Sequence, residues 1–163
     1  MRRHLIALLA TLVGLCGSTR IEAQNARAVD AAVESLSSKA NSLSTTNQNL
    51  VEMLASLDDR DRAQVDLFLT NMSDTNGYIN TLLMVAYIYP QMVDQRDATT
   101  VRRYLSLACG ALSKSADRTS ASGNKILPKL SSSALIQEVT KGRDLVVQLG
   151  QSDLCRIVPP HQR

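Results

Sequence analysis

The chain is poor in the residues that carry most enzyme chemistry. Its 163 residues include no tryptophan, one phenylalanine and two histidines. His4 precedes an apolar N-terminal run, and His161 lies so close to the C-terminus that we expect it to fray from the folded body. The composition therefore excludes a Ser-His-Asp or Cys-His catalytic arrangement, and a histidine-rich zinc site, within that body.

Motifs that bind cofactors are missing as well. The seven glycines form neither a Gly-x-Gly-x-x-Gly fingerprint nor a P-loop, and no Cys-x-x-Cys-His or Glu-x-x-His sequence occurs. Asp58, Asp59 and Asp61 are spaced like part of a calcium loop, but its glycine and distal glutamate are absent, so we interpret them as a helix cap. An enzyme that works with carboxylates alone stays open as a remote alternative. We expect no enzyme activity, no cofactor and no metal.

The N-terminus has the pattern of a secretory signal peptide. Arg2 and Arg3 precede an apolar run over residues 5–16, and small residues follow it. This run is shorter than the roughly 20 residues that a transmembrane helix needs. We predict cleavage after Ala23, with Ser18 as the competing position, and export of a single domain, residues 24–163, to the periplasm or the extracellular space. No later stretch is long and apolar enough to predict a transmembrane segment.

The charge balance is close to neutral without this signal. Removing residues 1–23 takes away three arginines and one glutamate, which leaves 15 basic and 14 acidic residues and a net charge of +1. We therefore expect no nucleic-acid partner and no electrostatic attraction to an anionic membrane.

Cleavage also leaves two cysteines, Cys109 and Cys155. An even count in an oxidising compartment predicts one disulfide between them. Closing a loop of this length stabilises a fold by roughly 3–4 kcal/mol in the chain-entropy description. Two unpaired buried thiols are the alternative.

The strongest pattern is a heptad repeat between Ala26 and Leu57. Its spacings alternate between three and four residues, as at the a and d positions of a coiled coil. The repeat consists of Ala26, Val29, Val33, Leu36, Ala40, Leu43, Asn47, Leu50, Leu54 and Leu57. A continuous helix over these residues would be about 48 Å long, so we expect a long N-terminal helix against which the rest of the chain packs.

The middle of the repeat, residues 41–49, is rich in Ser, Thr and Asn, which compete for backbone hydrogen bonds and disfavour helix interiors. Two predictions stay open: one helix over residues 26–57, which the unbroken repeat favours, or two helices over 26–43 and 48–57. In the continuous helix, Asn47 lies on the buried seam and fixes its register or its partner.

Two helical stretches follow before Pro90. Asp58 and Asp59 can cap a helix whose apolar stripe is Val65, Phe68, Leu69 and Met72. Residues 74–77 read Asp-Thr-Asn-Gly, which predicts a break. The apolar run over residues 78–89 then predicts a separate buried helix that Pro90 ends.

The C-terminal part predicts two more helices around a mobile connector. Asp97 or Thr99 can cap a helix whose expected buried face is Val101, Tyr104, Leu105, Ala108 and Leu112. Residues 113–129 are rich in Ser, Lys, Asp, Gly and Asn and predict the connector. Residues 131–133 can cap a last helix that ends at Gly150 and has an apolar stripe at Leu135, Val139, Val146 and Leu149.

These patterns predict an all-α fold, an antiparallel helical bundle of four to five helices with a long N-terminal heptad-patterned helix.

One segment suggests a function. Tyr78, Tyr87 and Tyr89 lie within twelve residues, beside Met84, and Tyr and Met are enriched in interface cores. The simpler interpretation is a core helix with tyrosine hydroxyls at its rim.

We expect an exported, non-catalytic protein that acts by protein–protein interaction or self-association, as an adaptor, a chaperone or an envelope-assembly accessory. The candidate surface is Asn47, Leu50, Leu54, Tyr78, Met84, Tyr87 and Tyr89. The alternative is a small-molecule-binding bundle with its ligand near Tyr78 and Tyr89. A partner surface should leave Leu50, Leu54 or Tyr87 exposed, whereas a ligand site should show a cavity that the tyrosines line.

Overall fold

The computed structural model describes the backbone of residues 2–88 and 95–157 and the side chains of residues 27–87 and 99–157. Its elements are α1 (Arg2–Leu54), α2 (Asp59–Ile88), α3 (Gln95–Ile126), the 3-10 helix η2 (Leu127–Lys129), α4 (Ser133–Gly150) and α5 (Asp153–Ile157). All the regular structure in these described ranges is helical, which confirms the all-α prediction.

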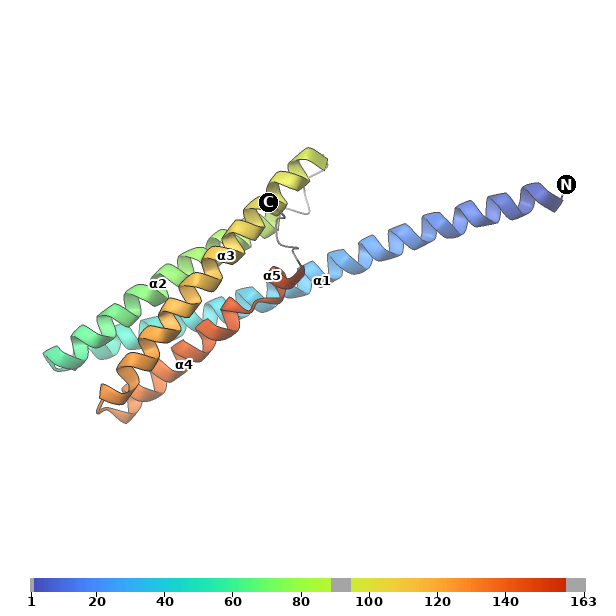
Figure 1. The fold of residues 1–163 in the computed structure, drawn as a ribbon. Coiled ribbons are helices and arrows are strands. Elements are labelled where there is room, and N and C mark those ends of the chain that lie inside the picture. The colour runs from blue at the N-terminus through green and yellow to red at the C-terminus, as the bar shows by residue number, and fades with distance from the viewer. Residues whose placement is uncertain (1, 89–94, 158–163) are drawn as a thin grey trace.

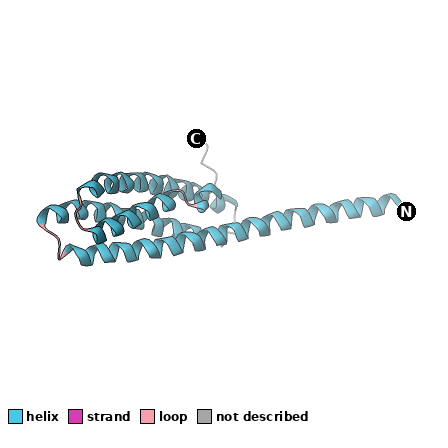
Figure 2. Ribbon diagram, turned by 90° about the horizontal axis from the view of Figure 1, so that it is seen from below, coloured by secondary structure: helices cyan, strands magenta, loops and turns pink. Residues whose placement is uncertain are grey.

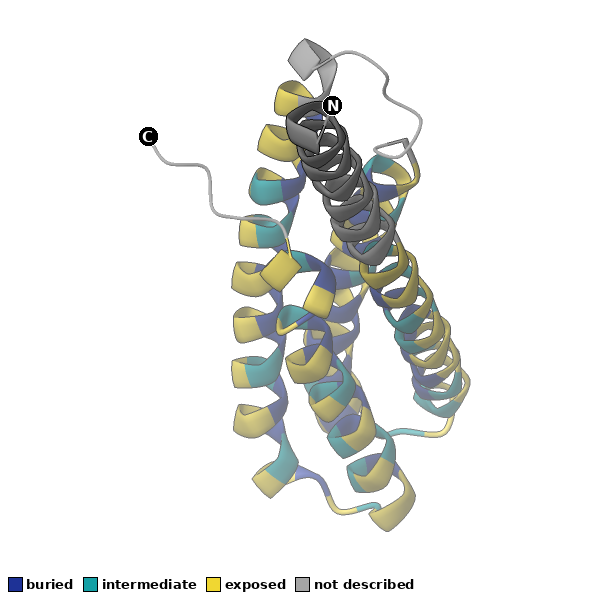
Figure 3. Ribbon diagram, turned by 90° about the vertical axis from the view of Figure 1, so that its right-hand side faces the viewer, coloured by how far each residue is buried: buried dark blue, intermediate teal, exposed yellow. Residues whose placement is uncertain are grey.

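Helices α1 to α4 form an antiparallel bundle. Consecutive helices run in opposite directions (Figure 1), and α1 packs against both α2 and α4, so the four helices enclose one core. The N-terminal half of α1 extends past the ends of the other helices (Figure 2), and the short α5 packs on α1 and α3. Buried residues line the inside of the bundle (Figure 3). Within the described residues, no helix has the length and apolar character needed to cross a membrane.

Helix α1 is continuous through the stretch rich in Ser, Thr and Asn. The hydroxyl groups of Ser42 and Thr45 donate to the carbonyl oxygens of Ser38 and Asn41, each over 3.1 Å, and so bond within the helix instead of breaking it. The prediction of one helix is confirmed, although α1 ends at Leu54 and not at Leu57.

The buried stripe of α1 is broader than a two-helix seam. Leu36, Leu43 and Leu50 are buried as the heptad predicts, but Thr46 is fully buried beside them and Asn47 is only half-buried. A helix that packs against two neighbours buries a wider face than a coiled-coil pair does. For this reason the buried face of α1 includes Thr46, which lies next to the predicted seam.

The predicted break at residues 74–77 is wrong, because α2 runs through it as one helix from Asp59 to Ile88. Met72 and Ile79 are fully buried on either side of this stretch, and burial of each such side chain is worth about 1.5–3 kcal/mol. Glycine in a helix interior costs only about 1 kcal/mol. Thr75 also faces the core, where its hydroxyl bonds the carbonyl oxygen of Asn71 at 2.9 Å. Packing therefore outweighs the local turn preference.

The predicted mobile connector over residues 113–129 is also wrong. Helix α3 continues to Ile126, and its buried positions recur at helical spacing through Ala116, Thr119 and Ile126. The small residues here permit close packing: a Cβ on Gly123 would lie 3.1 Å from Cε2 of Phe68. The small residues that make this stretch resemble a linker instead allow α3 to pack closely against the neighbouring helices.

The predicted caps of α2 and α4 and the end of α4 are confirmed, but the predicted cap of α3 at Asp97 or Thr99 is wrong, because α3 already begins at Gln95. The Asp58 carboxylate accepts the backbone N–H of Asp61 at 2.7 Å and so caps α2. The Ser132 hydroxyl accepts the N–H of Leu135 at 3.4 Å, and α4 ends at Gly150. The predicted α4 stripe is buried in full: Leu135, Val139, Val146 and Leu149.

The predicted disulfide is present between Cys109 of α3 and Cys155 of α5, with an S–S distance of 2.09 Å. It holds α5 against the bundle, where Leu154 is buried in the core and Ser152 is also buried. Since α5 has only five residues, the covalent link is a large part of what fixes it.

We expect Gly77→Ala to stabilise the protein by about 1 kcal/mol, because alanine is the better helix former and its Cβ would meet no atom within 4 Å. Gly150→Ala is the matched control and should destabilise, since its Cβ would lie 2.7 Å from the Cβ of Ala116. Urea unfolding measures both variants. A less stable Gly77→Ala variant would contradict the continuous α2.

Thr46→Val should stabilise the protein by about 1 kcal/mol, because the Thr46 side chain is fully buried and its Oγ1 has no hydrogen-bond partner. Thr75→Val makes the same chemical change but should destabilise by about 1–2 kcal/mol, since it removes the partner of the buried Ser115 hydroxyl. Opposite signs in thermal unfolding are the expected result, and equal shifts would refute this assignment of the core hydroxyls.

Replacing Cys109 and Cys155 together by serine should cost roughly 4 kcal/mol of unfolding free energy for a sequence separation of 46 residues. A reductant should shift the guanidinium unfolding curve of the wild type and leave that of the double variant in place. Thiols that react with iodoacetamide in the native, unreduced protein would disprove the link.

Candidate functional site

The α1 part of the predicted surface lies inside the bundle. Leu50 is 0% exposed, and Asn47 and Leu54 are half-buried. The Oδ1 atom of Asn47 is buried without a hydrogen-bond partner. Because this side of α1 packs in the core, Leu50 cannot belong to an exposed partner surface.

The α2 part of the predicted surface is exposed. Tyr78, Met84 and Tyr87 have exposed fractions of 37%, 62% and 72%. The opposite side of the same helix supplies the core residues Leu82 and Ala86. This stretch is therefore a core helix with large apolar side chains on its outer side. Tyr89 lies outside the described residues.

The outer side of α2 changes character along its length. From Asp59 to Asp74 it exposes the charged residues Asp59, Arg60, Arg62, Asp66 and Asp74. From Thr75 to the end of α2 at Ile88 the sequence has no charged residue. We call the exposed residues of this second stretch the uncharged α2 face: Gly77, Tyr78, Asn80, Thr81, Met84 and Tyr87. A water-facing helix surface ordinarily carries charge, and this one does not.

The first half of α3 adds apolar surface at the same end of the bundle. Tyr104 and Leu107 are 58% and 60% exposed, which corrects the prediction that Tyr104 is buried. Because α2 and α3 are antiparallel and consecutive, the end of α2 and the start of α3 lie together (Figure 1). Five of the nine exposed large hydrophobic residues among the described side chains fall on these two segments.

Two hollows in the described part of the bundle have room for a small ligand. One of about 430 Å³ lies between α3 and α4, beside Asp117, Asn124 and Gln151. The other, of about 450 Å³, lies between α1 and α4, beside Glu52 and Glu138. Neither is lined by a tyrosine, so neither is the predicted ligand cavity near Tyr78.

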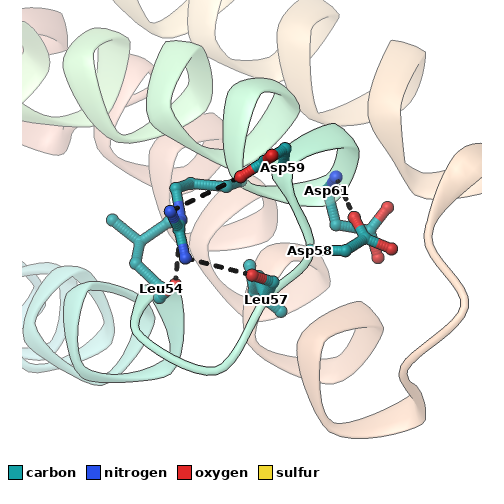
Figure 4. Close-up of polar contacts among 6 residues, drawn as sticks. Leu54, Leu57, Asp58, Asp59 and Asp61 are labelled. Atoms are coloured by element: carbon teal, nitrogen blue, oxygen red, sulfur yellow. Dashed lines mark hydrogen bonds and ion pairs between the residues drawn. The ribbon is translucent and has the colours of Figure 1, made fainter.

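The acidic cluster at the α1–α2 turn has a structural role (Figure 4). Asp58 caps α2, and Asp59 lies 3.7 Å from Arg62 as an ion pair. The Arg62 side chain also donates to the carbonyl oxygens of Leu54 and Leu57, which ties the end of α1 to the turn. Among the described residues, no group of three or more His, Cys, Asp or Glu side chains is placed to hold a metal ion.

A second feature, on α3, was missed from the sequence. Seven exposed residues follow one line along this helix in steps of three or four, which keeps them on one side. We call this line the α3 crest: Arg103, Leu107, Gly110, Lys114, Arg118, Ala121 and Lys125. Its helical spacing would have revealed it, but three of its four cations lie in the stretch expected to be a connector.

Comparison of the chain with protein families, with curated proteins and with solved structures found no match.

Proposed function

We propose that the protein is exported and acts without catalysis, by binding a second protein through the uncharged α2 face. The observation that carries this proposal is the exposure of Met84 and Tyr87, at 62% and 72%, on a helix surface without a charged residue. The pattern expected of a signal peptide and the disulfide between Cys109 and Cys155 support export, since disulfides persist in oxidising compartments.

The composition of this face suits a protein partner. Cores of protein interfaces are enriched in Tyr and Met and depleted of Lys, Glu and Asp. Tyr87 offers a large rigid surface, and Met84 adapts its shape to a partner. Gly77 has open space around its missing Cβ, so the backbone of a partner can approach α2 closely there.

The occupant that fits is an apolar, uncharged helix or surface of another protein. A charged partner would lose its hydration against this face without gaining an ion pair. Adaptor, chaperone and envelope-assembly roles all use such a contact. The ligand-binding alternative has less support, because the exposed tyrosines lie on the outside of the bundle and line neither hollow.

Site-specific photo-cross-linking in an envelope-containing host tests the proposal. A photoreactive residue at position 87 should give one discrete cross-linked species. The same residue at position 67 should not, although Leu67 is 57% exposed on the charged half of the same helix. The double variant Met84→Ser with Tyr87→Ser should lose more than tenfold in affinity for the isolated partner, since each lost apolar contact is worth about 1 kcal/mol or more.

Leu67→Ser is the matched control and should bind as the wild type does. All three substitutions lie on exposed positions, so thermal unfolding should stay within about 2 °C of the wild type. Equal cross-linking at positions 67 and 87, or undiminished binding by the double variant, would refute the proposal. A cross-linked species of twice the chain mass would identify the partner as a second copy.

A further inference from the structure

The α3 crest concentrates positive charge that the near-neutral net charge conceals. It carries Arg103, Lys114, Arg118 and Lys125 and no acidic residue. The single exposed acidic side chain described on α3, Asp117, lies beside the crest. On the outer side of α1 the exposed charges are mixed, with Arg27 beside Asp30, Glu34 and Glu52.

The crest cations are available to a partner. Ion pairs join Arg62 to Asp59, Arg143 to Asp144 and Arg156 to Asp153. Within the described part of the chain, none of the four crest cations takes part in an ion pair. Among the described residues, their charge is thus not compensated by a direct ion pair.

The crest also carries apolar surface. Leu107 is 60% exposed within the line of cations, and Tyr104, beside Arg103, is 58% exposed. A cluster of four or more Lys and Arg residues on an amphipathic helix is typical of segments that bind anionic lipid headgroups. From residue 103 to residue 125 the crest is about 33 Å long, which is long enough to contact several lipid headgroups at once.

We propose that the α3 crest docks the exported protein on an anionic lipid bilayer. The four cations face the headgroups, and Leu107 enters the boundary of the acyl region. A bilayer fits the crest because its cations follow one line of exposed positions over about 33 Å, so an extended anionic surface can contact all four at once. The hollow between α3 and α4 borders the crest only at Ala121, and none of the four crest cations lines it.

The test uses the exported protein and vesicles of phosphatidylcholine with about 30% phosphatidylglycerol, measured by co-sedimentation. Each cation near an anionic membrane contributes about fivefold to the partition coefficient. Arg118→Gln with Lys125→Gln should therefore lower binding about 25-fold. Arg60→Gln with Lys141→Gln removes the same charge from exposed positions on α2 and α4 and should change binding by less than about threefold.

Two further measurements separate the contributions. Raising the salt from about 0.1 M to about 0.5 M should release the wild type, since screening shortens to a few ångströms. Leu107→Ser should weaken binding and leave its dependence on salt unchanged. Because Leu107 is exposed, its replacement should leave the bundle folded, so weaker binding would not come from unfolding. Circular dichroism checks this.

Four outcomes would overturn the proposal: equal losses in the crest and control variants, equal binding to vesicles of phosphatidylcholine alone, no binding to the anionic vesicles at low salt, or binding to polyglutamate without binding to vesicles. The last would show that the crest recognises an acidic polypeptide.

Discussion

The contact of three buried hydroxyl groups fixes how α2 and α3 lie against each other. Thr75 Oγ1 lies 3.0 Å from Ser115 Oγ and 3.0 Å from Thr119 Oγ1. Sliding or rotating either helix by one residue would break both contacts. Thr75 and Thr119 keep a bond to a carbonyl oxygen of their own helix, but the buried Ser115 hydroxyl would lose its partner, at a cost of about 1–3 kcal/mol. The same register decides what faces outward. With Thr75 inside, Met84 and Tyr87 are exposed on α2, and with Thr119 inside, the α3 crest faces solvent.

The sequence predicted the elements whose signals are local and agree with each other. The heptad of α1, the caps at Asp58 and Ser132 and the end of α4 at Gly150 each satisfy a backbone or burial requirement within a few residues. Residues 74–77 and 113–129 were misread because their local turn preference opposes their tertiary packing. Tertiary packing is decided by contacts between residues that lie far apart in sequence, such as the contact of Phe68 with Gly123.

In the candidate site, too, local sequence signals identified some residues, whereas tertiary packing decided where they lie. Met84 and Tyr87 were recognised by composition, but that composition is shared by core and interface, so only the structure could assign them to the outside. Leu50 was misplaced because one seam was expected to face a partner, and α1 instead packs between two helices. The α3 crest was invisible because its periodicity has meaning only if residues 113–126 are helical.

The link between Cys109 and Cys155 closes a covalent ring that contains the second half of α3, all of α4 and the connection between them. A protease that cuts the backbone anywhere between these two cysteines opens the ring but releases no fragment. The two pieces stay joined and can still pair as neighbouring helices. A cut between α1 and α2, outside the ring, frees α1 from every covalent tie to the bundle. The C-terminal half of the molecule can therefore stay assembled after a backbone cut, whereas a cut in the α1–α2 turn has no covalent link to compensate for it.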